Sequence, residues 1–506
     1  MKCATAAEMR AMDQRAVHAH GISETELMQR AAQAMLDALC AHYGRTCRYG
    51  IFCGCGNNGG DGYALGELMA DAGMSLTICA RDGQLSPGAA VYAERAAEKG
   101  VRIARMDQAD EVIADSDVLV DALFGTGISR EMSGADAALA DRLIESGKPV
   151  AAVDIPSGMH ADGEWMSAHT VKAELTVTFV CLKEAMLRLP QREWCGKIEV
   201  RPIGMPPAAV QCADPAIVLD DERVRAMLPR RMPHSHKGTY GRVLLIAGSL
   251  NMSGAPRLCA QAILRAGAGL LTCMIPAGIH DIVASAIPEA MYRPLAMDEN
   301  GQIAVSALPQ PEQLRGFDLI VIGNGMGRAS STRAAVQLVL DSGVPCILDG
   351  DALYEAGMHG LLPTHRDSAL IVTPHLRELE YLSGIPLSQI SRDPRQCALT
   401  LAQRYPYLCV AAKDDFTWIV QESRQAVNIT GNDGLAKGGS GDVLCGIIAG
   451  LYAQGRQAFE SACAGVYLHA AAARHLAAHC DTMSILPHEL SECLGSVCAS
   501  LRRQRP

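Results

Sequence analysis

Short apolar runs alternate with helical patterns through the first two hundred residues. The runs RYGIFCG, SLTICA, VRIARM, DVLVDALFG, PVAAVDIPSG and LTVTFVCL predict strands, and the amphipathic segments 89–99 and 135–146 predict helices between them. Strands spaced by helices of this length form a parallel, doubly wound sheet. Ligand-binding loops in such a sheet follow the carboxyl ends of the strands.

The alternation stops at residues 201–215, RPIGMPPAAVQCADP, a segment rich in proline and small residues. This composition is typical of an interdomain linker. Beyond it, GRVLLIAGS, GLLTCMIP, DLIVIGNGMG, VPCILDGDAL, ALIVTPH, LCVAAKDD and TWIVQE predict the strands of a second α/β unit, and helices follow KGGSGDVLCGIIAGL. The chain of 506 residues is long enough for two such domains.

Composition and charge narrow the classes of partner. The net charge of -10 is spread without long runs of one sign, which argues against nucleic acid and membrane surfaces. No apolar run is long enough for a signal peptide core or a membrane span, so we expect a cytoplasmic protein. The nineteen cysteines are scattered singly, which favours reduced thiols and no zinc site. We expect small-molecule partners and a homo-oligomer.

The first strand is followed by CGCGNNGGDGYALG, in which Gly54, Gly56 and Gly59 have GxGxxG spacing. The loop offers backbone N–H groups, the amides of two asparagines and the carboxylate of Asp61 at the start of a helix. Such a loop suits a phosphate or a ribose. A tight turn with an Asn or Asp cap has the same composition, so this alternative stays open.

Two further loops follow predicted strands, DALFGTGISRE with Asp121 and AVDIPSGMHADGE with Asp154. Together with Asn58 and Ser157, these carboxylates would stand on one rim of the sheet. Their oxygens suit a hard cation or a polyhydroxylated ligand better than a soft metal. Each aspartate taken alone could equally be a helix cap.

In the second unit, Gly438, Gly439, Ser440, Gly441 and Asp442 stand directly before an apolar helix. The backbone N–H groups of residues 439–442, with the positive helix end behind them, would form a hole for the charge of a transferred phosphoryl group. The carboxylate of Asp442 could accept a proton from the attacking hydroxyl. A simple Gly-Ser-Gly turn with a first-turn acidic residue remains the alternative.

The order of GNNGGDG, DALFGTG and VDIPSG resembles the epimerase domain of bifunctional NAD(P)H-hydrate repair enzymes, a Rossmann-like fold, over residues 1–213. The resemblance implies that the dinucleotide is a damaged substrate and that a potassium ion, held by Asn58, Asp121 and Ser157, assists. It assigns substrate binding to Asn57, Asn58, Gly59, Gly60, Asp61, Gly125, Thr126, Gly127, Ile128, Ser129, Arg130, Glu131 and Asp154. Inverting the hydroxyl-bearing ring carbon requires an acid-base group. We expect Asp154 in this role, with Asp61 as the second candidate.

GGSGD resembles the GxGD motif of ribokinase-like proteins. KGTYG, AGSLNMSGA, GNGMG, DGDAL, TPHLRE and AAKDDFT follow the order of the dehydratase domain of the same family over residues 219–500, which implies a ribokinase-like α/β sandwich. The resemblance assigns hydrate contacts to Ala255, Gly327 and His375, nucleotide contacts to Lys413, Asp414, Asp415, Phe416, Thr417 and Gly441, and the base to Asp442. The sequence departs from the family pattern at Met326, Gly350, Leu376, Arg377 and Asp414.

The resemblance implies a repair enzyme for hydrated NADH and NADPH. One domain would interconvert the R and S hydrates, and the other would dehydrate the S hydrate with ADP or ATP and a magnesium ion. Phosphorylation would turn the ring hydroxyl into a good leaving group. Two alternatives stay open: a kinase of a small alcohol with a regulatory dinucleotide-binding domain, which would consume the alcohol together with ATP, and a dinucleotide sensor, which would bind without turnover.

Overall fold

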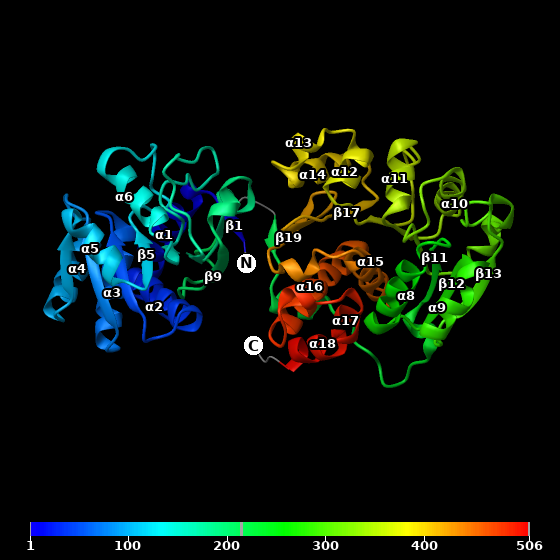
Figure 1. Cartoon of the computed structure of the whole chain (residues 1–506), viewed down its shortest axis with the longest axis horizontal. Helices are drawn as coiled ribbons and strands as arrows, with labels where there is room; N and C mark the ends of the chain where they lie inside the picture. Colours follow the sequence, from blue (N-terminus) through cyan, green and yellow to red (C-terminus); the bar gives the residue numbers. More distant parts are fainter. Residues whose placement is uncertain (1, 213–215, 504–506) are drawn as a thin grey trace. The chain divides into compact units, whose positions relative to one another are not determined.

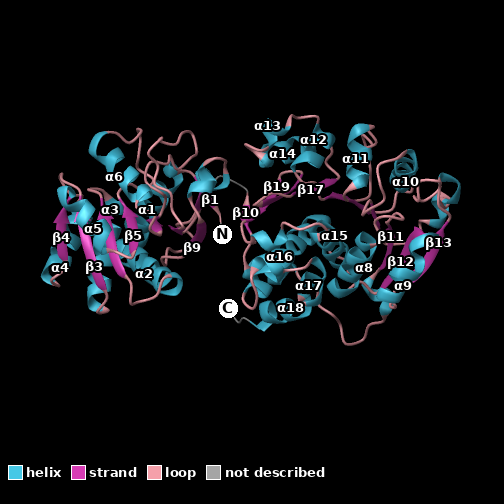
Figure 2. Ribbon diagram, viewed as in Figure 1, coloured by secondary structure: helices cyan, strands magenta, loops and turns pink. Residues whose placement is uncertain are grey.

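The computed structural model describes residues 2–212 and 216–503. The chain divides into two compact units, Met1–Asp214 and Pro215–Pro506. Each unit has its own sheet with helices on both faces, as Figures 1 and 2 show. The predicted α/β architecture with two units is confirmed. None of the described helices is both long and apolar enough to cross a bilayer.

The first unit is built on a seven-stranded parallel sheet with the strand order β4-β3-β2-β5-β6-β7-β9. The strands are β2 (Arg48–Cys53), β3 (Ser75–Ala80), β4 (Arg102–Arg105), β5 (Val118–Ala122), β6 (Val150–Val153), β7 (Leu175–Phe179) and β9 (Lys197–Arg201). The helices are α1 (Ala6–His20), α2 (Glu24–His42), α3 (Asn57–Asp71), α4 (Pro87–Glu98), α5 (Ala109–Asp115) and α6 (Gly134–Glu145). A small parallel pair, β1 (Cys3–Ala4) with β8 (Leu182–Lys183), ties the N-terminus to this unit.

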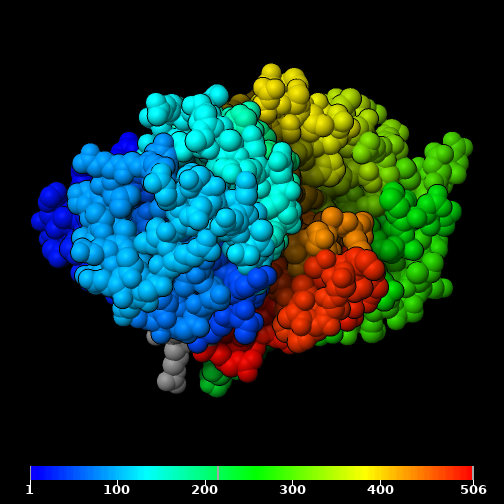
Figure 3. Space-filling model, turned by 60° about the vertical axis from the view of Figure 1, so that its left-hand side comes forward, coloured from blue at the N-terminus to red at the C-terminus, as the bar shows by residue number. Residues whose placement is uncertain are grey.

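The apolar side chains of the first unit form one cluster on each face of the sheet. Helices α2, α3 and α4 contribute to one cluster, and α5 and α6 contribute to the other. In Figure 3 this unit, coloured blue to cyan, presents a closely packed surface on the side shown. The order of strands reverses between β2 and β5, so the loops after these two strands diverge and leave room for a ligand.

The second unit has a ten-stranded sheet with the order β10-β19-β18-β17-β16-β15-β14-β11-β12-β13, antiparallel only at β17-β18 and β18-β19. Its strands are β10 (Ile217–Val218), β11 (Arg242–Ile246), β12 (Leu270–Pro276), β13 (Met291–Leu295), β14 (Leu319–Ile322), β15 (Cys346–Leu348), β16 (Leu370–Val372), β17 (Leu408–Ala412), β18 (Thr417–Gln421) and β19 (Arg424–Asn428). The helices are α7 (Asp221–Met227), α8 (Gly254–Ala266), α9 (His280–Ala286), α10 (Ser330–Asp341), α11 (Asp351–Met358), α12 (Leu376–Ser383), α13 (Leu387–Ile390), α14 (Pro394–Arg404), α15 (Ser440–Tyr452), α16 (Ala458–Ala477), α17 (Pro487–Glu492) and α18 (Leu494–Arg503).

Strands β9, β13 and β19 do not stand out as apolar runs in the sequence. β9 and β13 are edge strands with half-exposed or exposed side chains, and β13 contains Pro294, which an edge strand tolerates because one side of its backbone is unpaired. Part of the segment 201–215, expected to be an interdomain linker, is packed against the first unit. Ile203 and Ala209 are buried in the core of the first unit, and the side chain of Arg15 donates a hydrogen bond to the carbonyl oxygen of Ala209. Residues 202–212 therefore pack on the first unit.

Helix α15 lies unusually close to α8. A Cβ atom added at Gly446 would stand 2.5 Å from the carbonyl oxygen of Cys259, and one added at Gly450 would stand 2.5 Å from that of Ile263. Only glycine permits this approach, because both neighbouring atoms belong to the backbone. The approach holds the start of α15, and with it Asp442, against α8.

The variant Gly446→Ala should lower the free energy of unfolding of the second unit by about 1–3 kcal/mol, because the added methyl group must push α8 and α15 apart. Urea titration followed by circular dichroism measures this loss. Gly495→Ala is the matched control, since nothing lies within 4 Å of a Cβ atom at this position of α18. It should change stability little or raise it by about 0.4–1 kcal/mol. Equal losses in both variants would contradict the close packing.

Candidate active sites

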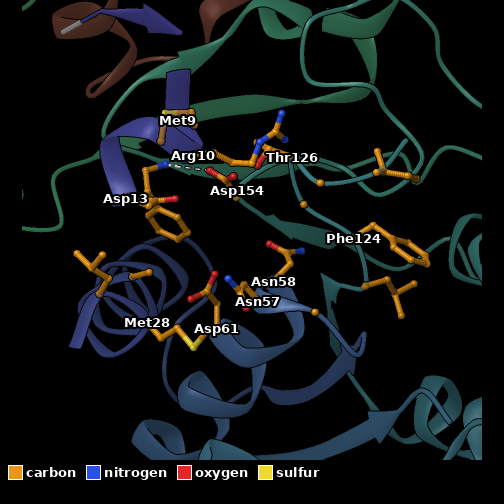
Figure 4. A pocket seen from close by; sticks show the side chains of 18 of the residues that line it. Met9, Arg10, Asp13, Met28, Asn57, Asn58, Asp61, Phe124, Thr126 and Asp154 are labelled. Carbon is orange, nitrogen blue, oxygen red and sulfur yellow. Dashed lines mark hydrogen bonds between the residues drawn. The ribbon is translucent and has the colours of Figure 1, made fainter. Parts of the chain in front are cut away.

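The first unit contains a cavity of about 620 Å³ at the carboxyl ends of its strands. Figure 4 shows that α3 begins at its edge, that the loop after β5 crosses it and that α1 brings Arg10 and Asp13 to it. Most residues assigned to substrate binding by the resemblance line this cavity: Asn57, Asn58, Asp61, Gly125, Thr126, Gly127, Ile128, Ser129, Arg130 and Asp154. The cavity thus joins three loops that are distant in the sequence.

Gly59, Gly60 and Glu131 are not among the lining residues. A Cβ atom at Gly59 would stand 1.9 Å from the carbonyl oxygen of Gly54, and one at Gly60 would stand 2.9 Å from the sulfur of Met28. These two glycines let α3 pack closely, whereas a Cβ atom at Gly56 meets nothing within 4 Å. Part of the GxGxxG spacing therefore serves packing, which was the alternative left open by the sequence.

The three residues expected to hold potassium lie next to one another. Ser157 donates two hydrogen bonds to Asp121, from its backbone nitrogen to Oδ2 (2.8 Å) and from Oγ to Oδ1 (2.6 Å). Ser157 Oγ also accepts a hydrogen bond from the backbone nitrogen of Phe124 (2.9 Å). The side chain of Asn58 lies against Gly125, the residue after Phe124: a Cβ atom added at Gly125 would stand 3.1 Å from Asn58 Oδ1.

This oxygen cluster of Asn58, Asp121 and Ser157 fits a monovalent cation. Burial raises the pKa of the Asp121 carboxyl to about 6, although the hydrogen bonds from Ser157 act in the opposite direction. Asn58 Nδ2 is buried and has no hydrogen-bond partner in the described part of the chain. Rotating the amide by 180° would put its oxygen in the place of this nitrogen. One carboxylate with neutral oxygens suits potassium. Residues 2–212 and 216–503 contain no group of three or more His, Cys, Asp or Glu that could hold a metal ion.

Asp154 follows β6 with a left-handed backbone, φ 67°, which is rare for a residue other than glycine. This backbone conformation occurs at a loop that lines the cavity. Asp154 Oδ1 accepts hydrogen bonds from Thr178 Oγ1 (3.1 Å) and the backbone nitrogen of Phe179 (3.3 Å), and it pairs with the ammonium group of Lys183. The side chain of Lys183 is 0% exposed, so its charge has no access to water. The lysine holds Asp154 at the cavity.

Two other carboxyl groups face this ion pair. Burial, together with the charges of Asp154 and Asp13, raises the pKa of Asp61 well above its ordinary value, and burial raises that of Asp13 to about 6. Sequence reasoning missed Lys183 and Asp13. Lys183 could have been noticed as a lone charge in the apolar run after β7, whereas Asp13 lies among other polar residues of an amphipathic helix and gives no such signal.

Replacing Lys183 by methionine keeps the length of the side chain and removes its charge. The free energy of unfolding of the first unit should fall by about 3–5 kcal/mol, because Asp154 keeps a charge that has lost its buried partner. In the double variant Lys183→Met/Asp154→Asn, the loss should be smaller than the sum of the single losses by about 1–3 kcal/mol. Denaturant titration of the four proteins gives this coupling energy.

Lys197→Met is the control for the loss of a lysine from an exposed ion pair, since the Lys197 side chain is 57% exposed and pairs with Glu199. It should change stability by no more than about 0.5 kcal/mol. Additive losses at positions 154 and 183 would show that the two side chains are not coupled.

The second unit gathers polar residues at the ends of four adjacent strands and at the start of α15. Asn324 Nδ2 donates hydrogen bonds to Asp349 Oδ2 (3.0 Å) and to Asp442 Oδ1 (2.8 Å). Asp349 Oδ1 accepts from Thr373 Oγ1 (2.7 Å) and from Lys413 Nζ (3.3 Å). Asn324, Asp349, Thr373 and Lys413 follow β14, β15, β16 and β17 in that order, so neighbouring parallel strands bring them together.

The environment adjusts both charged groups at the centre of this network. Burial and the charge of Asp349 raise the pKa of Asp442 to about 7, which Asn324 and Lys413 partly oppose. Burial alone would lower the pKa of Lys413, but the charges of Asp349 and Glu378 outweigh it and raise that pKa. A base with a pKa near neutrality beside a permanent ammonium charge suits proton abstraction coupled to phosphoryl transfer.

The side chain of Lys413, which we expect to bind the nucleotide, ends near the start of α15. Its Nζ lies 3.2 Å from where a Cβ atom of Gly441 would stand, so the ammonium group is at the start of α15. Asp414, Asp415 and Phe416 form the turn between β17 and β18, and Thr417 begins β18.

The residues expected to contact the hydrate lie on loops around the same network. Ala255 is at the start of α8, where its Cβ would be 2.8 Å from a Cβ atom added at Gly325, and Gly327 donates its backbone N–H to Asp351 Oδ2 (2.7 Å). His375 caps α12: its Nδ1 accepts hydrogen bonds from the backbone nitrogens of Arg377 and Glu378. Its side chain is half-exposed, and its Nε2 lies 3.4 Å from Glu378 Oε1.

Four of the residues that depart from the family pattern can be described by their local structure. Gly350 has a φ of 54°, a conformation that favours glycine over residues with a side chain. Leu376 and Arg377 form the first turn of α12 behind the capping His375, and Met326 is buried. These substitutions leave the network around Asp349 intact.

Known proteins match the chain in both units. A family model described as NAD(P)H-hydrate dehydratase matches residues 243–495, and one described as the N-terminus of YjeF-related proteins matches residues 24–185. Relatives named bifunctional NAD(P)H-hydrate repair enzyme Nnr match over nearly the full length. The protein from Moorella thermoacetica is 32% identical over 100% of this chain and 98% of its own, and that from Coxiella burnetii is 33% identical over 96% of both.

Solved structures match the second unit. The ADP/ATP-dependent NAD(P)H-hydrate dehydratase from Bacillus subtilis, co-crystallized with ATP/Mg2+, is 30% identical with a TM-score of 0.50, covering 56% of this chain and 99% of its own. A ribokinase-like superfamily protein from Enterococcus faecalis is 25% identical with a TM-score of 0.51, covering 58% and 99%. The predicted ribokinase-like fold of the second unit is thereby confirmed. From both units and from the full-length relatives, it follows that this chain belongs to the family of bifunctional NAD(P)H-hydrate repair enzymes.

Proposed function

We propose that this protein repairs hydrated NADH and NADPH, with an epimerase in residues 1–213 and a dehydratase in residues 219–500 that consumes ADP or ATP. The observation that carries the proposal is the presence, in one chain matched along its length to repair enzymes, of two separate sites centred on aspartates. The first site suits inversion at a ring carbon, and the second suits phosphoryl transfer.

In the second unit, Asp442 accepts the proton of the ring hydroxyl while the hydroxyl oxygen bonds to the terminal phosphorus of the nucleotide and the bond to the leaving phosphate breaks. The ammonium group of Lys413 and the N–H groups at the start of α15 stabilise the charge on the transferred group. The lone pair of the ring nitrogen then expels the phosphate. Loss of a proton from the neighbouring ring carbon restores the dihydronicotinamide.

In the first unit, Asp154 exchanges a proton with the ring hydroxyl or with the water that replaces it. Lys183, Thr178 and Phe179 all donate hydrogen bonds to one oxygen of Asp154, which leaves Oδ2 available to the substrate. Asn57, Asp61 and the loop of residues 125–130 are placed to bind the dinucleotide around the reacting ring.

Two cations complete the proposal. Asn58, Asp121 and Ser157 would hold a potassium ion, whose positive charge would favour the ionised form of Asp121. A magnesium ion in the second unit would neutralise phosphate charge, as the ATP/Mg2+ complex of the Bacillus relative supports. Because magnesium binds mainly through phosphates and one or two carboxylates, Asp349 is the candidate ligand from the protein.

Cytoplasmic location is supported by nineteen cysteines scattered singly along the chain, a usage typical of reducing compartments. The homo-oligomeric state stays a prediction.

The direct test incubates the protein with a mixture of R and S hydrates, with and without ADP or ATP, and follows the absorbance of the restored dihydronicotinamide. With nucleotide, both hydrates should disappear, because the epimerase converts the R form into the substrate of the dehydratase. Recovery limited to the S portion would remove the epimerase from the proposal. Consumption of ATP with a hydroxymethyl-pyrimidine or thiazole alcohol, or tight hydrate binding without turnover, would replace the proposal by the kinase or the sensor.

Asp442→Asn should lower the rate of dehydration by about 10²- to 10⁴-fold, because the amide cannot accept the proton of the ring hydroxyl. The amide Oδ1 still accepts the hydrogen bond from Asn324 Nδ2, and the side chain keeps its size, so ADP affinity should change little. Single-turnover dehydration and calorimetric ADP binding measure the two effects. Unchanged dehydration would remove Asp442 from the mechanism, and unchanged epimerisation serves as the internal control.

Asp154→Asn should abolish the interconversion of R and S hydrates while dehydration of the pure S form continues. The nearly isosteric amide keeps the contacts to Thr178 and Lys183 but cannot cycle a proton. Chromatographic separation of the two hydrates over time measures the rate, and the unfolding transition of the first unit shows whether the fold is kept. Near-normal interconversion would transfer the acid-base role to another carboxyl group such as Asp61.

A further inference from the structure

Three aspartates face the cavity of the first unit, each from a different element. Asp13 comes from α1, Asp61 from α3 and Asp154 from the loop after β6, and Figure 4 shows all three pointing toward the same space. The ammonium group of Lys183 lies behind Asp154. Epimerisation through Asp154 uses only one of these carboxyl groups, so the other two need an explanation.

Resting on the epimerase function proposed above, we propose that Asp13 is a second catalytic residue of the first unit, which exchanges a proton with the substrate across the cavity from Asp154.

The position of Asp13 is fixed by contacts at the start of α1. Thr5 and Glu8 form a capping box at its start, and the backbone nitrogen of Ala6 donates to Asp162 Oδ1 (2.6 Å). β1, directly before the helix, pairs with β8 so that Ala4 stands opposite Lys183. The N-terminal segment is thus held on the strand that carries the lysine partner of Asp154, which brings α1 and the acid-base pair into one rigid arrangement.

Asp13 turns toward the cavity from the side of α1 next to its buried face. Met9, Met12 and Ala16 are buried, whereas Arg10 and Asp13 are exposed at the cavity, which Met9 also lines. No residue in the described part of the chain donates a hydrogen bond to the Asp13 carboxyl, in contrast to the three donors at Asp154. A carboxyl group without protein partners is free to bond to a substrate hydroxyl or to a water molecule.

The charged groups around Asp13 leave it able to gain and lose a proton near neutral pH. Burial raises its pKa to about 6, Asp154 after β6 and Glu24 of α2 act in the same direction, and Lys183 of β8 acts in the opposite direction. Asp61 of α3 also faces this group, and the pKa of Asp61 lies well above its ordinary value. The raised pKa of Asp61 favours its protonated form, which can donate a hydrogen bond, while Asp13 can cycle.

Inversion of a ring carbon bearing a hydroxyl next to nitrogen needs a group on each face of the ring. The carboxyl group of Asp13 gives its proton to the hydroxyl, the carbon–oxygen bond breaks and water leaves, while the nitrogen lone pair forms a double bond to the carbon. A second water then bonds to the opposite face and loses a proton to the Asp154 carboxylate. The reverse reaction exchanges the two roles, so one proton is shared by the pair and water in the cavity returns it.

The experiment uses the full-length protein and one hydrate epimer as substrate, with the interconversion rate measured chromatographically from pH 5 to 9 and the uncatalysed rate subtracted. The wild-type rate should fall as pH rises through about 6, where Asp13 loses its proton. Asp13→Asn should lower the maximum rate by about 10²- to 10⁴-fold. Asp13→Glu keeps a titrating carboxyl and should retain a descending limb at a shifted pH.

Asp37→Asn makes the same chemical change on the exposed side of α2 and should leave rate and pH profile unchanged. Nucleotide-dependent dehydration of the S hydrate should be normal in every variant. A rate within threefold of wild type for Asp13→Asn, with its alkaline limb retained, overturns the proposal. If Asp13→Asn does not fold, Asp13→Glu decides instead: a rate that falls with rising pH at the same pH as in the wild-type protein overturns the proposal. A wild-type protein that does not interconvert the hydrates at any pH overturns the epimerase function itself, and this inference with it.

Discussion

The cost of burying a carboxylate governs both sites of this protein. A carboxylate removed from water must find a cation or several donors, or it becomes protonated. Each unit solves the problem with a lysine from another strand: Lys183 of β8 pairs with Asp154 after β6, and Lys413 after β17 pairs with Asp349 after β15. In both pairs the aspartate directly follows a strand of a parallel sheet, and the lysine comes from a strand that is not next to it in that sheet. The charges of these ion pairs in turn shift the pKa values of the nearby carboxyl groups of Asp442 and Asp13.

The two units differ in how a further carboxyl group is linked to the lysine–aspartate pair. This group is Asp442 in the second unit and Asp13 in the first. In the second unit, Asn324 bridges Asp349 and Asp442, so the base is linked to the ion pair by one amide. In the first unit, Asp13 has no such bridge and feels the ion pair through space. The pKa of Asp442 is raised to about 7 and that of Asp13 to about 6, by burial and by a like charge in each case. Neutral pH then lies close to both values, where a group transfers protons most effectively.

Most of the fold could be predicted from the sequence because buried parallel strands are continuous apolar runs, such as LIVI in β14 and VAAV in β6, between helices of regular length. Edge strands were missed: β9 and β13 are partly exposed, and Pro294 in β13 conceals the pattern. Loop residues such as Asn57, Asp121 and Asp442 could be chosen because they follow strands or precede helices within glycine-rich motifs. Asp13, Lys183 and Asn324 become part of a site only through tertiary contacts, and periodicity carries no information about those.

The glycines of the first motif show why a spacing pattern is weaker evidence than the contacts it produces. Gly54 and Gly59 touch each other's backbone and the adjoining strand end, while Gly56 opens on the cavity. A packing function and a binding function thus share one motif, and the same is true of α15, where Gly446 and Gly450 serve packing and Gly441 lies beside Lys413. Close packing without side chains is what allows a helix to begin at the site with its N–H groups directed at the ligand. Packing and chemistry are therefore selected together at these positions, and a substitution there changes stability and activity for one physical reason.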